Sequence, residues 1–219
     1  MNKQERLALF QEVDIYPVTC EALSHGRSNS EVLESVIQGG AKIIQLREKK
    51  LSKKKYYDLA RTFRIATQNH NVLLIINDHI DIALAVHADG VHLGQDDLPI
   101  HVARALAPEL IIGASTHNLQ EALDAELAGA DYVNIGPIFS TSTKENVETF
   151  LGPKVISEIS PHLTIPFTTM GGINLDNIHL VLEQGAKRVA MVTGITQADN
   201  ITERVKFLKH LIQSYGKGN

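Results

Sequence analysis

The chain has 219 residues, of which 43% are hydrophobic and 21% are charged, which is ordinary for a globular protein. A net charge of −4 argues against a general nucleic-acid binder, and the single cysteine, Cys20, excludes an internal disulfide framework. No apolar stretch reaches the length of a membrane span, and the first residues lack the apolar core of a signal peptide. We therefore expect a cytoplasmic protein without nucleic-acid or membrane partners.

Eight short apolar runs are continuous rather than alternating, as expected for strands that are buried on both faces. In chain order they span residues 15–19, 43–47, 73–77, 91–93, 111–115, 132–135, 167–170 and 189–192. Helical patterns follow them at residues 30–38, 52–69, 81–87, 99–107, 119–128, 153–159, 177–184 and 200–215. This alternation predicts an α/β protein, with residues 1–219 forming a single (β/α)8 TIM barrel; a doubly wound open sheet is the alternative.

Cationic residues follow the second predicted strand. Successive strand residues point to opposite faces, so Gln45, Arg47 and Lys49 are placed to share one face. Two cations and an amide at the carboxyl end of a barrel strand suit a phosphate or pyrophosphate. A solvated charge run is the alternative, and we favour it for the later lysines at positions 50 and 53–55.

Acidic residues follow the third and fourth predicted strands. Asn77 and Asp78 end the third strand, and Asp97 lies shortly after the fourth. In a parallel barrel these ends lie on one rim, where two carboxylates can share a Mg²⁺ ion. Capping of the following helices is the alternative for either aspartate taken alone.

The loop after the fifth strand begins with Ser115, which can hydrogen-bond a substrate. His117 is either an acid/base group or a polar residue near a helix start, and Asn118 is placed to cap the following helix. After the sixth strand, hydroxyl residues lead to Lys144, an arrangement that can wrap anionic oxygens.

Glycines follow the last two predicted strands, at Gly171-Gly172 and after Val192-Thr193. Backbone amides exposed at such positions form the phosphate site that is frequent after strands seven and eight of barrels. A plain turn is the alternative for a Gly-Gly pair considered alone.

Together these stretches resemble the thiamine-phosphate synthase family, from Tyr16 through Thr193. The resemblance is carried by six segments in family order: QLREK at 45–49, IND at 76–78, VHLGQDD at 91–97, GASTHN at 113–118, GPIF with TSTK at 136–144, and GGI at 171–173. It implies a (β/α)8 barrel that joins an aminomethylpyrimidine diphosphate to a thiazole phosphate and releases pyrophosphate.

The resemblance also assigns the candidate residues to roles. The pyrimidine diphosphate would be bound by Gln45, Arg47, Lys49 and Asn77. The metal Mg²⁺ would be held by Asp78 and Asp97, and the pyrimidine or its pyrophosphate would be contacted by Ser115 and Lys144. The thiazole phosphate would be held by Thr141, Thr143, Gly171, Gly172, Val192 and Thr193.

The implied chemistry needs no protein nucleophile. An electron-rich aminopyrimidine can lose pyrophosphate to give a stabilised cation, which the thiazole nitrogen then attacks. Catalysis then consists mainly of stabilising the departing anion, which suits Mg²⁺ with Arg47, Lys49 and Lys144.

The chain departs from the family pattern at a few positions. Cys20 stands where the family usually has Asp, Ser142 where it has Pro, and Thr193 where Ser is common; the loop at 145–151 is not the usual Pro-rich form. None of these departures removes an assigned ligand. Cys20 and the loop at 145–151 bear instead on the substrate preference. A homo-oligomer is compatible with the sequence.

Two other functions are compatible with a barrel of this kind. A thiazole tautomerase of the same superfamily would need no diphosphate site, so the presence of Arg47, Asp78 and Asp97 favours the synthase. A non-catalytic ligand-binding barrel is disfavoured, because unused charges on a partly buried rim carry a desolvation cost.

Overall fold

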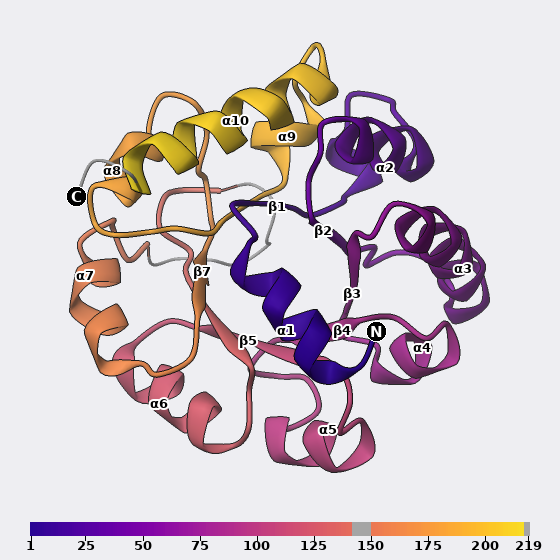
Figure 1. The fold of residues 1–219 in the computed structure, drawn as a ribbon, viewed down its shortest axis with the longest axis horizontal. Helices are drawn as coiled ribbons and strands as arrows, with labels where there is room; N and C mark the ends of the chain where they lie inside the picture. Colours follow the sequence, from indigo (N-terminus) through magenta and orange to yellow (C-terminus); the bar gives the residue numbers. More distant parts are fainter. Residues whose placement is uncertain (142–149, 217–219) are drawn as a thin grey trace.

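The computed structural model describes residues 1–141 and 150–216 as a ring of strands surrounded by helices (Figure 1). Within these residues one eight-stranded sheet has the order β1-β8-β7-β6-β5-β4-β3-β2, and every pairing is parallel. The strands are β1 (Ile15–Pro17), β2 (Ile43–Leu46), β3 (Leu73–Asn77), β4 (Gly90–Leu93), β5 (Ile111–Thr116), β6 (Tyr132–Ile135), β7 (Phe167–Thr169) and β8 (Val189–Met191).

The ring closes between its first and second strands. Val18 forms a parallel bridge with Gln45, and the backbone N–H of Thr19 donates to the Gln45 carbonyl at 3.0 Å. The predicted (β/α)8 barrel is therefore confirmed, and the alternative of an open doubly wound sheet is wrong.

The eight predicted helices are present, with ends that differ by at most a residue or two. They are α2 (Asn29–Gln38), α3 (Lys53–Asn69), α4 (Ile80–Ala85), α5 (Ile100–Leu106), α6 (Leu119–Leu127), α7 (Val155–Ile159), α8 (Ile178–Leu182) and α10 (Ile201–Gly216). Sequence patterns did not predict α1 (Lys3–Gln11), α9 (Thr193–Thr196) or two 3-10 turns, η1 (Glu21–Leu23) and η2 (Ser160–His162). No helix in the described part of the chain combines the length and apolar character needed to cross a membrane.

Local capping explains where several helices begin. The Ser28 side chain accepts from the backbone N–H of Glu31, whose carboxylate in turn accepts from Ser28, which completes a capping box at α2. Asn118 accepts from the N–H of Glu121 at α6, as predicted. These local hydrogen bonds fix the residues at which α2 and α6 begin in the outer layer of the barrel.

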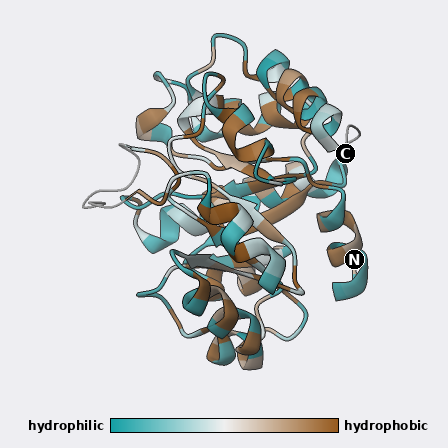
Figure 2. Ribbon diagram, turned by 90° about the vertical axis from the view of Figure 1, so that its left-hand side faces the viewer, coloured by the Kyte–Doolittle hydropathy of each residue, from teal (hydrophilic) through white to brown (hydrophobic). Residues whose placement is uncertain are grey.

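The barrel has two apolar layers because successive strand residues point to opposite faces. On β3, Leu74 and Ile76 pack outward against the helices, whereas Leu73 and Ile75 lie in the interior cluster. The helices bury one face and leave the other to solvent, and Figure 2 shows brown hydrophobic and teal hydrophilic residues mixed within them.

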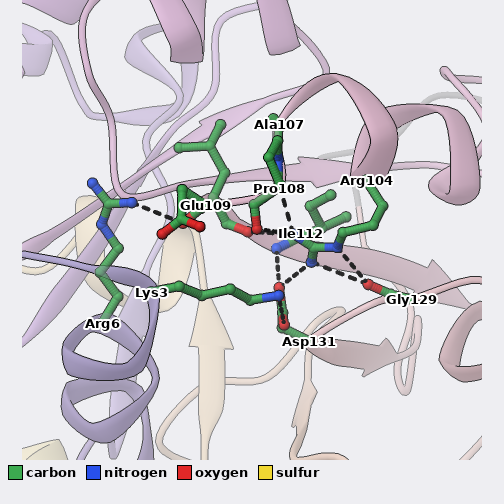
Figure 3. Close-up of polar contacts among 10 residues, drawn as sticks. Lys3, Arg6, Arg104, Ala107, Pro108, Glu109, Ile112, Gly129 and Asp131 are labelled. Carbon is green, nitrogen blue, oxygen red and sulfur yellow. Dashed lines mark hydrogen bonds and ion pairs between the residues drawn. The ribbon is translucent and has the colours of Figure 1, made fainter.

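Helix α1 lies across the amino-terminal end of the barrel (Figure 1). Its Phe10 is fully buried, and the ring packs against that of Tyr132 with centroids 4.6 Å apart. Ion pairs hold the helix in place: Lys3 lies 2.9 Å from Asp131, which also pairs with Arg104 (Figure 3). This cover leaves the opposite rim, at the carboxyl ends of the strands, as the place for a site.

Candidate active site

The predicted rim residues lie where the barrel strands end. Gln45 lies in β2, Asn77 is the last residue of β3, and Ser115 lies in β5. Gln45 and Asn77 are buried, at 5% and 8% exposure, although both are polar. Buried polar side chains at this end of a barrel are typical of residues that orient a ligand.

The structure brings Asp78 and Asp97 together. Asp78 follows β3 in the left-handed region, with φ of 63°, and its N–H donates to the His92 carbonyl at 2.8 Å. Burial raises the pKa of the Asp97 carboxyl, and contact with the Asp78 carboxylate raises it further. A backbone N–H of Gly94 donates to Asp97 Oδ2 at 2.7 Å and keeps this side chain in place.

Helix capping does not explain this carboxylate pair. The residues at the N-cap positions of α4 and α5 are His79 and Pro99, and neither makes a side-chain capping bond. The capping alternative for Asp78 and Asp97 is therefore wrong. Two adjacent carboxylates repel each other unless a cation or a proton lies between them, so the pair fits a divalent metal.

The two carboxylates suit Mg²⁺ better than a metal with an all-protein cage. Among the described residues, no group of three or more His, Cys, Asp or Glu side chains is arranged to hold a metal ion. Mg²⁺ is commonly bound by one or two carboxylates together with substrate phosphates and water. Lys49 adds positive charge at the same place, because its ammonium group contacts Asp78.

The loop that carries Arg47 and Lys49 is tied to the loop after β1. The backbone N–H of Arg47 donates to the Thr19 hydroxyl at 2.9 Å. Between the two cations, Glu48 accepts from the backbone of Glu21 at 2.7 Å and from the Asn29 amide at 3.0 Å. This anchor, which sequence patterns did not predict, fixes the backbone on both sides of Arg47.

A chain of hydrogen bonds crosses the barrel interior, and we call it the interior chain. The Gln45 amide donates to the Tyr16 hydroxyl, which bonds the Tyr132 hydroxyl; that hydroxyl bonds His92 Nδ1, and His92 Nε2 bonds Ser115 Oγ. Each of these four donor–acceptor distances is 3.0 Å. The interior chain therefore links Gln45 and Ser115, two predicted substrate ligands on different strands.

Burial sets the ionisation of the interior chain. It lowers the pKa of His92 to about 4 and raises the pKa values of Tyr16 and Tyr132. His92 is therefore a neutral imidazole and both phenols are protonated near neutral pH. Sequence reasoning missed these three members, although a histidine within an apolar strand was a usable signal.

His117 belongs to the start of α6. Its Nδ1 bonds Glu121 Oε2 at 2.8 Å, and the same carboxylate oxygen accepts from the His117 backbone N–H. This geometry matches the alternative of a polar residue near a helix start.

The loops after β6 and β7 are interlocked. The N–H of Ile138 donates to the Met170 carbonyl at 3.0 Å, and that of Phe139 donates to the Gly171 carbonyl at 2.9 Å. Gly172 has a φ of 64°, and a Cβ atom there would lie 2.2 Å from the Ser140 carbonyl oxygen. The two predicted phosphate-binding loops thus form one unit.

The other residues predicted to bind the thiazole phosphate lie beside the interlocked loops or outside the described residues. Thr141 is the last residue described before the gap at 142–149, and Thr193 begins α9 directly after Val192. Ser142, Thr143 and Lys144 lie outside the described residues.

We expect Gly172→Ala to destabilise the protein by roughly 1–3 kcal/mol, because the new Cβ combines an unfavourable φ with a backbone clash. Gly185→Ala is the matched control, since Gly185 also has a positive φ, of 91°, but a Cβ added there would meet no atom within 4 Å. Urea denaturation of both variants measures the difference. Equal losses would show that the interlocked loops contribute nothing beyond the backbone strain.

The closed parallel sheet and its charged rim place the chain among (β/α)8-barrel proteins with a site at the carboxyl ends of the strands. A profile of the family described as thiamine monophosphate synthase matches residues 15–195. The chain belongs to this family.

Individual relatives agree with this assignment. A thiamine-phosphate synthase of Dictyoglomus thermophilum is 43% identical over 219 residues, covering 100% of this chain and 98% of the relative. One from Shouchella clausii is 46% identical, covering 85% of this chain and 90% of its own. The solved structure of thiamine phosphate pyrophosphorylase from Pyrococcus furiosus superposes with a TM-score of 0.85 at 34% identity, covering 93% and 97% of the two chains.

Proposed function

We propose that residues 1–219 form one catalytic barrel with thiamine-phosphate synthase activity, a transferase reaction. The substrates are 4-amino-2-methyl-5-(diphosphooxymethyl)pyrimidine and a thiazole phosphate, and the products are thiamine phosphate and pyrophosphate. Membership of the family supports this proposal. The structural observation that supports it most directly is the adjacent pair of carboxylates, Asp78 and Asp97, with Lys49 in contact with Asp78.

In the proposed reaction, the bond between the pyrimidine methylene carbon and the diphosphate oxygen breaks, and its electron pair leaves with the diphosphate. The thiazole nitrogen then uses its lone pair to form the new carbon–nitrogen bond. Arg47, Lys49 and Lys144 stabilise the negative charge that develops on the leaving group. Asp78 and Asp97 would hold Mg²⁺, which would supply further positive charge to the leaving group.

The remaining candidate residues bind and orient the two substrates. Gln45, Asn77 and Ser115 hold the pyrimidine diphosphate at the ends of their strands. The thiazole phosphate is anchored by neutral donors, namely Thr141, Thr143 and the backbone near Gly171, Gly172, Val192 and Thr193. Neutral dipoles suffice for a phosphate that only anchors its substrate, whereas a diphosphate that must leave requires formal positive charge.

A pyrophosphate-release assay with both substrates, with and without Mg²⁺, tests the proposal. Release that depends on both substrates and on the metal supports the synthase. Aromatisation of the thiazole without Mg²⁺ would instead identify a tautomerase, and binding of ligands without turnover would identify a non-catalytic barrel.

We expect Lys144→Met to reduce turnover much more than it weakens affinity for the pyrimidine diphosphate, because the charge that Lys144 faces develops in the transition state. Steady-state kinetics separates the two effects, and the melting temperature should change little. Lys50→Met is the control, since Lys50 is exposed and belongs to the solvated charge run. A Lys144 variant that changed only the Michaelis constant would contradict the role.

A further inference from the structure

The interior chain has a direction that its own hydrogen-bonding groups determine. The Gln45 amide nitrogen can only donate, so the Tyr16 oxygen accepts from it. The single proton of Tyr16 is then available for Tyr132, which lies 3.0 Å away. No other hydrogen-bond partner of the Tyr16 hydroxyl is found among residues 1–141 and 150–216.

The same reasoning fixes the tautomer of His92. If Tyr132 accepts from Tyr16, its own proton has one partner in the described chain, His92 Nδ1. The opposite tautomer, with a proton on Nδ1, would leave the buried Tyr132 hydroxyl proton without an acceptor, which is costly in an interior. His92 Nδ1 therefore accepts the Tyr132 proton, so the ring is neutral and carries its own proton on Nε2.

The two ends of the interior chain consequently present opposite groups to a ligand. His92 Nε2–H donates to Ser115 Oγ at 3.0 Å, so the serine keeps its own proton to donate. At the other end one N–H of the Gln45 amide is held by Tyr16, which fixes the orientation of the amide and leaves Oε1 able to accept from a ligand. Oε1 makes no hydrogen bond within the described residues. It is also absent from the fully buried side-chain atoms that lack a partner there, so it is accessible to a ligand.

The sequence makes room for the central member of the interior chain. A Cβ atom at Gly113 would lie 2.1 Å from Cζ of Tyr132 and 2.4 Å from its hydroxyl oxygen. Glycine at this position of β5 lets the Tyr132 hydroxyl lie against the strand that carries Ser115. The close approach is steric, because Gly113 does not have a positive φ.

We propose that Tyr16, Tyr132 and His92 are positioning residues that hold Gln45 as an acceptor and Ser115 as a donor. The site then selects a pyrimidine ring that offers an N–H to Gln45 and a nitrogen lone pair to Ser115. This inference rests on the proposed function for its substrate. A 4-aminopyrimidine has this pattern, with an exocyclic amino donor beside ring nitrogens that accept, whereas a 4-oxo analogue reverses donor and acceptor on that edge.

The first test needs no enzymatic activity. Nitrogen-15 NMR of the wild-type protein at neutral pH reports which ring nitrogen of His92 carries the proton, and the signals are assigned by their loss in His92→Gln. We expect the Nε2–H tautomer. An Nδ1–H tautomer or a charged ring would overturn the inference, even in a protein that is a fully active synthase.

The second test measures selectivity. Tyr132→Phe removes one hydroxyl and keeps the ring that packs on Phe10. We expect the preference in kcat/KM for the 4-amino over the 4-oxo pyrimidine diphosphate to fall by about tenfold, the worth of one hydrogen bond. Tyr56→Phe is the matched control: it also deletes a buried hydroxyl, which donates to the Leu46 carbonyl at 2.6 Å outside the interior chain.

The outcomes separate the inference from the proposed function. Unchanged selectivity in Tyr132→Phe, or an equal loss in Tyr56→Phe, would overturn the positioning role. If Tyr132→Phe does not fold, Gly113→Ala displaces the same hydroxyl, and the NMR result on the wild type still decides the tautomer. Absence of pyrophosphate release by the wild type would refute the proposed function and leave the tautomer test intact.

Discussion

Replacing Asp97 by Asn is expected to reduce turnover by roughly 100-fold or more, since a catalytic metal contributes several kcal/mol of charge stabilisation. The Asn side chain keeps an oxygen for the Gly94 N–H but removes the negative charge that Mg²⁺ would need. The melting temperature should not fall, because the change also removes the repulsion between Asp97 and Asp78. Pyrophosphate release at increasing Mg²⁺ concentrations measures the effect.

Asp96→Asn is the matched control, because Asp96 is the exposed neighbour of Asp97 and should tolerate the same change with full activity. Asp97 is a cleaner target than Asp78. Asp78 also contacts Lys49 and has a left-handed backbone, so its replacement disturbs a cation and a strained turn at once. Full activity of Asp97→Asn, or activity that survives a chelator, would exclude the metal site.

Replacing Asp89 by Ala is expected to destabilise the fold by about 3–5 kcal/mol, the usual result of removing one partner from a buried ion pair. The Asp89 side chain is 3% exposed and pairs with Arg64 at 2.7 Å and with Arg6 of α1 at 3.2 Å. It also accepts from the Leu74 N–H at 2.9 Å, so one change leaves several groups without their acceptor. Urea denaturation measures the loss.

Glu12→Ala serves as the comparison for Asp89, because Glu12 pairs with Lys42 at the surface, where its side chain is 60% exposed. Such pairs contribute about 0–1 kcal/mol. If Asp89→Ala cost no more than this control, the ion pairs of Asp89 with Arg6 and Arg64 would have no part in stability. Activity at low temperature should survive in the folded fraction, since Asp89 lies at the covered end of the barrel.

Local sequence patterns were sufficient for most of the fold. The strand at Leu73–Asn77 and the helix that Asn118 caps were predicted within a residue, because continuous apolar runs and capping residues act over short distances. Helix α1 was missed for the complementary reason. Phe10 is its one buried residue, and the contacts that hold it, such as Lys3 with Asp131, join positions far apart in the chain.

The candidate site also has features that the sequence predicted and features that depend on tertiary contacts. The order of strands placed Asp78 and Asp97 on one rim, but their contact depends on the left-handed backbone of Asp78 and on the Gly94 turn. Helix capping by these aspartates was a wrong alternative, because proximity in sequence to a helix start does not place a residue at the N-cap position.

By itself, the sequence determined the alternation of strands and helices, and with it the rim on which the polar residues after each strand would lie. Only the tertiary structure decided which of those residues meet. The interior chain from Gln45 to Ser115 shows why. Tyr16, Tyr132 and His92 come from separate strands, and no local pattern in those apolar runs tells which side chains will be partners. The bonds of Tyr132 to Tyr16 and to His92 join strands that are not neighbours in the sheet, so they form only once the barrel closes and brings these side chains to 3.0 Å across a shared interior.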